Sequence, residues 1–105
     1  MPYVVILAPE AVKQLKALRA KAYAEVRDAL ELHLRHEPAK VSKSRIKKLR
    51  GLSQPQFRLR VGEIRVYYDV TGRTVDVLAV ITKAQADAWL KQKGVPGEKG
   101  GAGQG

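Results

Sequence analysis

Two stretches in which apolar and polar residues alternate strictly meet at Gly62 and Glu63, and they predict a β-hairpin over residues 57–68. Glycine at the first of the two central positions suits a type II′ turn. Successive strand residues point to opposite faces, so this turn also predicts how the strands pair. It places three pairs on one apolar face: Val61 with Ile64, Leu59 with Val66, and Phe57 with Tyr68.

The opposite face of the hairpin is predicted to carry three arginines and a tyrosine, with Arg60 opposite Arg65 and Arg58 opposite Tyr67. Like charges directly opposite on a sheet destabilise it by up to ~1 kcal/mol, so this face would gain from a bound anion. Two interpretations stay open at this point. The face is either a solvated outer surface, where arginine is common, or a site for phosphate groups.

The segment before the hairpin begins with a short apolar run over residues 3–7, whose β-branched content predicts a buried strand. A helix is expected to start at Pro9, because proline fits the first turn of a helix. A second helix is predicted over residues 22–36, and it ends before Pro38, since the residue preceding proline avoids the helical conformation.

The segment after the hairpin predicts one strand and one helix. The strand spans residues 74–81 and has apolar residues on both faces, which indicates a central strand covered on both sides. One face is predicted to hold Val75, Val77, Ala79 and Ile81, and the other Leu78 and Val80. Thr82 is a suitable N-cap for a helix over residues 83–93. The Gly-rich residues 94–105 are predicted to be a disordered tail.

The predicted order of elements is therefore β-α-α-β-β-β-α. This order indicates an α+β fold, with a mainly antiparallel four-stranded sheet and helices packed on it. A chain of 105 residues is long enough for one modest core, and we assign that single domain to residues 1–93.

The charge of the chain narrows the range of partners. Its 20 Lys and Arg residues outnumber 10 Asp and Glu residues, giving a net charge of +10. The positive electrostatic field of such a chain favours binding to nucleic acid, to an acidic protein or to an anionic membrane surface. The absence of cysteine excludes disulfides and a thiol nucleophile. No apolar run approaches the ~20 residues of a transmembrane helix. We find no signal peptide and expect a cytoplasmic protein.

Residues 39–56 contain a dense run of cations and are predicted to form a loop, marked by Gly51, Ser53 and Pro55. The cations of this basic segment are Lys40, Lys43, Arg45, Lys47, Lys48 and Arg50. The segment is either a solvated linker or an electrostatic arm for a phosphate backbone. The clustering of its charges, which are not interspersed with acids, favours the arm.

The histidines and the largest aromatic residues have structural interpretations of their own. His33 lies on the apolar stripe of the second helix and is expected to pack, while His36 suits the negative end of that helix. No third ligand accompanies them, so we predict neither a metal site nor a cofactor. Tyr68 is expected in the core. Trp89 either packs the last helix on the sheet or stacks on a base of RNA.

The arrangement of several short motifs resembles the RelE/ParE superfamily of toxin–antitoxin toxins. The resemblance covers about residues 2–92. It rests on Lys-Leu-Arg-Gly at residues 48–51, the basic alternating strand at 57–60, the Gly-acidic turn followed by Arg-Val-x-Tyr at 62–68, and the apolar strand at 75–80. It implies a small cytoplasmic toxin that a cognate antitoxin holds inactive.

The resemblance implies two candidate activities. RelE-like members enter the ribosomal A site and cut mRNA there without a metal, by attack of a 2′-hydroxyl on the adjacent phosphate. ParE-like members share the fold, lack the nuclease residues and act on DNA gyrase. The three arginines predicted on one face of the hairpin favour the RelE-like activity. Ribosome-dependent mRNA cleavage is therefore the leading hypothesis, and inhibition of DNA gyrase is the alternative. A plain RNA-binding module is a third possibility.

The site residues that the resemblance implies are matched unevenly. The basic residues of the family's strand fall on Arg58 and Arg60, and its phosphate-binding arginine falls on Arg65. A second critical arginine falls near Lys83, and an aromatic residue of the last helix falls near Trp89. Lysine keeps the charge but loses the bidentate fork of arginine.

Cleavage would also need proton transfer, for which Lys83 and Tyr67 are the candidates. We therefore predict a catalytic set and an RNA-binding set. The catalytic set is Arg58, Arg60, Arg65 and Lys83. The RNA-binding set is Lys43, Arg45, Lys47, Lys48, Arg50, Tyr67 and Trp89. The expected partners are the antitoxin, the ribosome and mRNA, with no membrane and no small-molecule cofactor.

Overall fold

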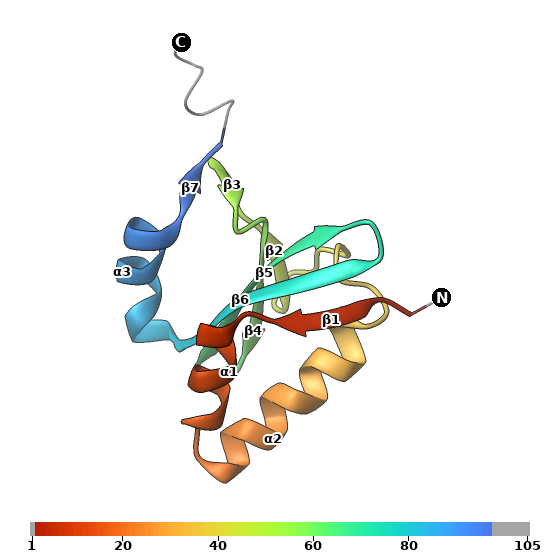
Figure 1. Ribbon diagram of the computed structural model, residues 1–105, viewed down its shortest axis with the longest axis vertical. Helices are drawn as coiled ribbons and strands as arrows, with labels where there is room; N and C mark the ends of the chain where they lie inside the picture. The colour runs from red at the N-terminus through yellow and green to blue at the C-terminus, as the bar shows by residue number, and fades with distance from the viewer. Residues whose placement is uncertain (1, 98–105) are drawn as a thin grey trace.

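The computed structural model describes residues 2–97 and arranges them as a sheet with helices on both faces (Figure 1). The strands of the five-stranded sheet lie side by side in the order β1 (Val4–Leu7), β6 (Thr74–Thr82), β5 (Ile64–Thr71), β4 (Phe57–Val61) and β2 (Ile46–Lys48). The strand β1 runs parallel to β6, and the other neighbours are antiparallel. The α+β class and the mainly antiparallel sheet are thus confirmed.

The predicted hairpin is present as β4 and β5, with all five predicted residue pairs in register. Gly62 has a φ of +58°, and among the described residues no residue other than glycine has a positive φ. This combination fits a type II′ turn, which needs a positive φ only at its first central position. Two apolar pairs of the hairpin, Leu59 with Val66 and Phe57 with Tyr68, lie in the main core.

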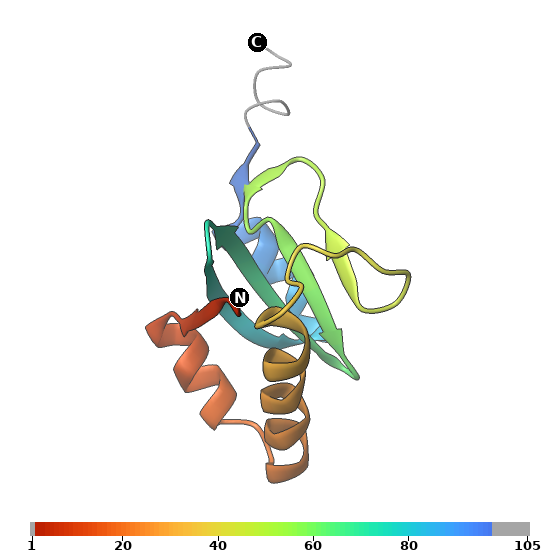
Figure 2. The same ribbon diagram turned by 90° about the vertical axis from the view of Figure 1, so that its right-hand side faces the viewer.

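The main core lies between the sheet and two helices, α1 (Pro9–Lys16) and α2 (Ala20–Ala29). Pro9 opens α1 as predicted. The second helix begins at Ala20, two residues earlier than predicted, and continues into a π-helical turn, η1 (Leu30–Leu34). Figure 2 shows the two helices on the same side of the sheet, with α3 on the other side.

The prediction of four strands is wrong because residues 39–56 are not all loop. The strand β2 pairs with β4 at the edge of the sheet, and β3 (Leu52–Gln54) pairs with β7 (Val95–Pro96) in a separate two-stranded sheet. In β2 only Ile46 is buried, and the two lysines after it are exposed. Three residues with one apolar position are too few to produce a recognisable alternation.

The predicted faces of β6 are wrong beyond Val77. Tyr67 pairs with Ala79, but Tyr68 pairs with Val77, so the register shifts and Leu78 is an extra residue. A β-bulge of this kind reverses which side chains face the core. Val75, Val77 and Val80 consequently lie in the main core, whereas Ala79 and Ile81 face the helix on the other side.

The last helix, α3 (Lys83–Lys93), has the predicted bounds and the predicted N-cap. The Thr82 hydroxyl accepts from the backbone N–H of Gln85 at 3.2 Å, and the Gln85 side chain accepts from the N–H of Thr82 at 3.1 Å. Residues 94–97 were assigned to a disordered tail, but the pairing of β7 with β3 places them in the fold. The rest of the predicted tail, residues 98–105, lies outside the described residues.

Candidate nucleic-acid interface

Four cations share the face of the sheet that points away from α1 and α2: Lys47, Arg58, Arg60 and Arg65. We call this set the arginine face. The strand register places Lys47 beside Arg58, Arg58 beside Tyr67, and Arg60 beside Arg65. The two salt bridges found among the described residues, Arg35–Glu31 and Lys40–Glu37, involve none of these four. The arginine face therefore has positive charge that no carboxylate within residues 2–97 pairs with.

Arg65 is the most buried cation of this face, with only 7% of its surface exposed. Its Nη1 donates to the carbonyl oxygens of Gly62 at 2.9 Å and Ile64 at 3.1 Å. The guanidinium therefore holds the hairpin turn together in addition to contributing its charge. Lys83 lies at the same end of the hairpin, because its backbone N–H donates to the Glu63 carbonyl oxygen at 2.8 Å.

Arg58 is half-buried, and its Nε atom is buried without a hydrogen-bond partner among the described residues. Burial lowers the pKa of Arg58, as do the charges of Arg65 and Arg60, while Tyr67 opposes them. A guanidinium stays protonated at neutral pH despite such a shift. Because its charge is partly desolvated and beside two like charges, an anion bound here would relieve both unfavourable effects.

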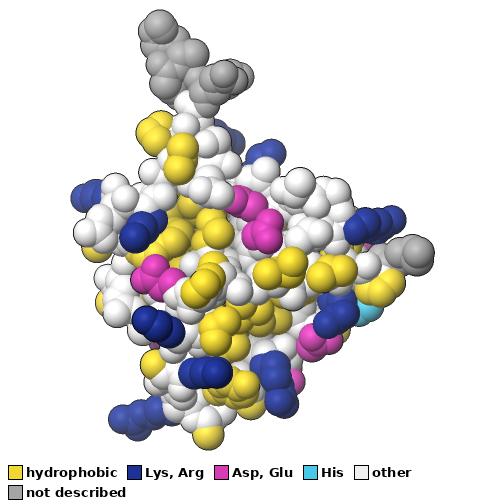
Figure 3. All heavy atoms as spheres, viewed as in Figure 1, with side chains coloured by type: hydrophobic (Ala, Val, Ile, Leu, Met, Phe, Trp, Pro, Cys, Tyr) yellow, Lys and Arg dark blue, Asp and Glu magenta, His cyan; other side chains and the backbone are white. Residues whose placement is uncertain are grey.

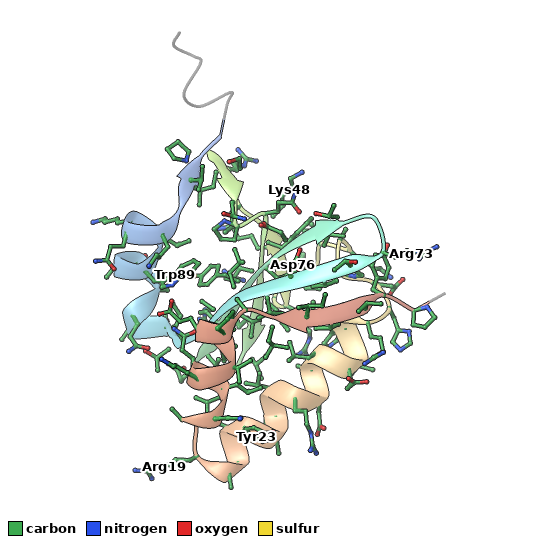
Figure 4. All side chains as sticks on the ribbon, viewed as in Figure 1. Arg19, Tyr23, Lys48, Arg73, Asp76 and Trp89 are labelled. Atoms are coloured by element: carbon green, nitrogen blue, oxygen red, sulfur yellow. The ribbon has the colours of Figure 1, made fainter. Side chains whose placement is uncertain are left out.

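The helix α3 covers part of this face. The rings of Trp89 and Tyr67 are stacked, with centroids 5.2 Å apart and an angle of 16° between their planes. Tyr67 is only 3% exposed, and Trp89 points from α3 towards the sheet (Figure 4). Tyr67 therefore already covers one side of the indole, and this contact competes with the predicted stacking of Trp89 on RNA.

The two candidates for proton transfer differ in their exposure. The side chain of Lys83 is exposed to solvent, whereas that of Tyr67 is buried. Burial raises the pKa of Tyr67, against the opposing effect of Arg58 and Arg65. A tyrosine with a raised pKa keeps its proton at neutral pH and suits a proton donor rather than a base.

The basic segment does not gather on the arginine face apart from Lys47. The Lys48 ammonium lies 5.9 Å from the centre of the Phe57 ring, on the side of the sheet that faces the main core. Arg45 lines a hollow of about 420 Å³ next to α2. The side chains of Lys43 and Arg50 are exposed in loops.

The histidines also lie away from the arginine face. His33 is half-buried in the π-helical turn, and burial together with the charge of Arg45 lowers its pKa. His36 is exposed. Within residues 2–97, no group of three or more His, Asp or Glu side chains is arranged as metal ligands would be.

Two side-chain networks that fix the hairpin were not anticipated. The Asp69 carboxylate accepts from Gln54 Nε2 at 2.8 Å and from the backbone N–H of Gln56 at 2.7 Å. The Tyr68 hydroxyl donates to the Pro38 carbonyl oxygen at 2.6 Å, and Tyr68 is fully buried as predicted. The glutamines on either side of Pro55 are a weak sequence signal for the first network. Flexible polar side chains in a loop do not indicate which groups they bond.

The fold and the arginine face define a class of protein: a small basic α+β protein that presents an unpaired cation cluster on a sheet. The family comparison then gives the assignment. Residues 5–87 match the model described as ParE toxin of the type II toxin–antitoxin system, parDE, so the chain belongs to this toxin family. The expected membership in the RelE/ParE superfamily is thereby confirmed, and the protein is a toxin of a toxin–antitoxin system.

Solved structures of similar proteins include several toxin–antitoxin complexes. The chain is 29% identical to a chain of the RelBE2 complex from Mycobacterium tuberculosis, with a TM-score of 0.68 and coverage of 80% of this chain and 94% of that one. The chain is 26% identical to a chain of the archaeal RelE–RelB complex from Pyrococcus horikoshii OT3. The TM-score is 0.66, and the match covers 81% of this chain and 99% of that one. These relatives support an antitoxin as the partner of this chain.

The isolated E. coli RelE toxin shares the fold at 20% identity and a TM-score of 0.58, with coverage of 86% of this chain and 98% of that one. A search of curated proteins finds no match. Among the described residues, no helix is long and apolar enough to cross a membrane.

Proposed function

We propose that this toxin is a RelE-like endoribonuclease that acts with the ribosome, cuts mRNA in the A site and so inhibits translation. The observation that carries the proposal is the cluster of Arg58, Arg60 and Arg65 on one face of the sheet, without an ion pair to any described carboxylate. The net charge of +10 supports an RNA partner as well, and Figure 3 shows Lys and Arg side chains at many places on the surface. This activity would place the protein in the cytoplasm.

The proposed chemistry is attack of the 2′-hydroxyl on the adjacent phosphate, which forms a 2′,3′-cyclic phosphate and releases the 5′-oxygen. Arg58 and Arg60 are suited to stabilise the charge on the pentavalent phosphorus, because their forked donors match two phosphate oxygens. Arg65 adds positive charge while it holds the turn. Tyr67, whose pKa is raised by burial, suits protonation of the leaving 5′-oxygen.

Neither the arginines nor Tyr67 suits removal of the 2′-proton. Lys83, the remaining candidate, is exposed to solvent, so in this proposal the 2′-proton passes to water. We therefore assign much of the rate acceleration to positioning of the RNA on the ribosome and to charge stabilisation by the arginine face. This division makes a specific claim: cleavage depends on translating ribosomes, and free RNA is cut far more slowly.

A toeprint assay on translating ribosomes tests the proposal. We expect the wild type to truncate mRNA at the A-site codon, and Arg58→Ala to lose most of this cleavage. Arg19→Ala is the matched control, since Arg19 is an exposed arginine at the start of α2, outside the arginine face (Figure 4). Absence of A-site cleavage by the wild type would reject the proposal.

Inhibition of DNA gyrase is the second candidate. The observation that favours it is the match to the ParE toxin model, together with the absence of a base among the residues of the arginine face. Supercoiling by purified gyrase, measured with the same protein preparation, separates the two. Inhibition of supercoiling without mRNA cleavage would establish this second function.

A further inference from the structure

The two edges of the five-stranded sheet, formed by β1 and β2, differ in charge. An edge strand presents open backbone groups, and proteins commonly protect such an edge with lysines. The edge at β2 follows this rule, since Lys47 and Lys48 are exposed there. The edge at β1 does not, because residues 2–9 read Pro-Tyr-Val-Val-Ile-Leu-Ala-Pro and carry no charged side chain. We call the outer margin of Val4–Leu7 the β1 edge (Figure 1).

Apolar side chains are exposed along the β1 edge. Tyr3, Val5 and Leu7 pack against the main core, so Val4 and Ile6 point to the other side of the sheet. Val4 is 56% exposed and Ile6 is 49% exposed, although both residue types are usually buried. Figure 3 shows apolar side chains on the surface along the strand that Figure 1 labels β1. An uncharged edge of this kind fits an apolar strand and not a nucleic acid.

The backbone of β1 offers hydrogen bonds to such a strand. The N–H groups of Val4 and Ala8 both donate to carbonyl oxygens of the segment that contains β6, at 2.8 Å. Alternate residues of a strand bond to the same neighbour. The N–H and C=O groups of Val5 and Leu7 therefore point away from β6, towards the open side of the edge.

The open part of the β1 edge is short. At its beginning, the Tyr3 N–H already donates to the Arg35 carbonyl oxygen at 2.7 Å, so Arg35 occupies the place of a further strand there. At its end, Pro9 has no N–H to donate. An added strand thus forms its hydrogen bonds with Val5 and Leu7.

A second copy of β1 matches this pattern in one register. With the two strands antiparallel around a two-fold axis at Ile6, Val5 of each copy lies opposite Leu7 of the other. Each of these two pairs exchanges both backbone bonds, which satisfies all the open groups of both copies. An axis at Val5 would place Leu7 opposite Tyr3, where Arg35 already lies. An axis at Leu7 would place Val5 opposite Pro9, which lacks the donor.

The net charge of +10 does not prevent this pairing, because the arginine face lies away from β1. Its cation nearest to β1 in the strand order is Arg65 on β5, two strands from the edge. Five strand spacings, ~24 Å, would separate the β5 strands of the two copies. This distance is about three Debye lengths at physiological ionic strength. The antiparallel pairing also brings Arg73, at the start of β1, towards Glu10, which follows its end in the other copy (Figure 4).

We propose that two copies of this toxin associate through their β1 edges, antiparallel and with the two-fold axis at Ile6, so that their sheets form one continuous sheet. The two Ile6 side chains cover each other, and Val4 of each copy lies opposite Ala8 of the other. The two arginine faces lie on the same side of this sheet, towards its two ends. Because the interface is small, the dimer is weak and forms at micromolar or higher concentrations.

Disulfide trapping tests the register, because the natural chain contains no cysteine. In the proposed dimer the Cα atoms of the two Ile6 residues lie ~4.5 Å apart, within the range that a disulfide bridges. Those of the two Val4 residues lie ~14 Å apart, which no disulfide bridges. Ile6→Cys and Val4→Cys are therefore a matched pair on the same strand, face and edge, with similar exposure.

We expect the purified Ile6→Cys toxin to form disulfide-linked dimers at least tenfold faster than the Val4→Cys toxin under the same mild oxidation. Val41→Cys, at a residue with 57% exposure outside β1, gives the rate of random collisions, and the Val4→Cys rate should equal it. Equal rates for all three variants would overturn the proposal. A faster rate for Val4→Cys than for Ile6→Cys would also overturn it.

Sedimentation of toxin without added cysteines gives an independent measurement. The association constant of the wild type should rise with salt, because the like net charges are screened, whereas binding to RNA weakens with salt. Ile6→Lys should lower the association constant at least tenfold. Leu32→Lys, at an apolar residue with 67% exposure outside β1, should leave it unchanged. A wild type that stays monomeric at millimolar concentration, or equal effects of the two variants, would contradict the proposal.

Amide hydrogen exchange distinguishes a second copy from an antitoxin strand at the same edge. We expect the N–H groups of Val5 and Leu7 to become protected as the concentration of toxin alone increases. Protection that depends on added antitoxin and not on toxin concentration would assign the β1 edge to the antitoxin and overturn the proposal. None of these measurements involves RNA cleavage, so their failure would leave the proposed nuclease function standing.

Discussion

Replacing Trp89 with alanine should destabilise the protein by about 2 kcal/mol. A fully buried Trp→Ala change costs ~3–5 kcal/mol, and a stacked aromatic pair contributes ~0.5–1.5 kcal/mol beyond its buried area. Trp89 is only half-buried, which lowers the first value, although the change removes its stack with Tyr67. The indole Nε1 is buried and has no hydrogen-bond partner in the described part of the chain, so removing this polar atom offsets part of the loss of stability.

The assay for this prediction is thermal unfolding, combined with RNA binding at a temperature where the variant is folded. In a domain of this size ~2 kcal/mol corresponds to a Tm decrease of roughly 8–16 °C. Trp89→Phe is the control, because a phenyl ring can still stack on Tyr67 and lacks the unpartnered donor. We expect its Tm to stay close to that of the wild type.

The opposite pattern would refute this reasoning. If Trp89→Ala left the Tm unchanged but weakened RNA binding, the indole would serve RNA and not the packing of α3. The stack with Tyr67 would then be a resting contact that RNA replaces, and the RNA-stacking role predicted from the sequence would be restored.

Three further predictions concern the elements that hold the hairpin and the helices. Tyr68→Phe should cost ~1–3 kcal/mol in urea unfolding, because it leaves the buried Pro38 carbonyl without its donor, whereas Tyr67→Phe, whose hydroxyl has no hydrogen bond among the described residues, should cost far less. Thr82→Ala should lower stability by about 1 kcal/mol through loss of the cap of α3, measured in the same way; no change would mean that the capping bonds contribute little. The pKa of His33 is lowered in the folded state, so the unfolded chain takes up a proton first as the pH falls below 6.5; stability should therefore decline with falling pH in this range, and His33→Gln should make the decline shallower.

The hairpin was predictable because two local signals agree. Strict alternation assigns each residue of β4 and β5 to a face, and Gly62 determines where the chain turns. Once the turn is placed, the register follows without any knowledge of the rest of the fold. The arginine face was predictable for the same reason, since its three arginines all belong to this hairpin.

The bulge in β6 could not be predicted from the pattern of residues. The strand is apolar on both faces, so a shift of one residue exchanges apolar side chains for other apolar side chains. Only the packing on each side distinguishes the two registers: Val80 fills the main core, and Ala79 leaves room for α3. The short strand β2 was missed because its single buried residue, Ile46, gives no periodic signal.

Packing of Trp89 on the sheet was one of the two interpretations that the sequence left open, but the sequence did not predict that α3 would cover part of the arginine face. Three alanines, Ala84, Ala86 and Ala88, stand in this helix, and alanine is compatible with either a buried or an exposed position. The sequence therefore leaves open which side of α3 faces the sheet. The sequence also gives no indication that Trp89 would lie on Tyr67 and thereby bury one candidate for proton transfer.

The proposed nuclease function requires the arginine face to be the part of the molecule that acts on mRNA. The most direct test measures cleavage of a defined mRNA held on the ribosome with one codon in the A site, using Arg60→Ala. Arg60 is exposed, so its removal should leave the fold intact, unlike that of the buried Arg65. We predict that cleavage falls roughly 100-fold, as when one donor to a transition-state oxygen is lost, with an unchanged Tm and with wild-type cleavage by Arg19→Ala. Wild-type cleavage by Arg60→Ala, or equal losses in both variants, would contradict the account.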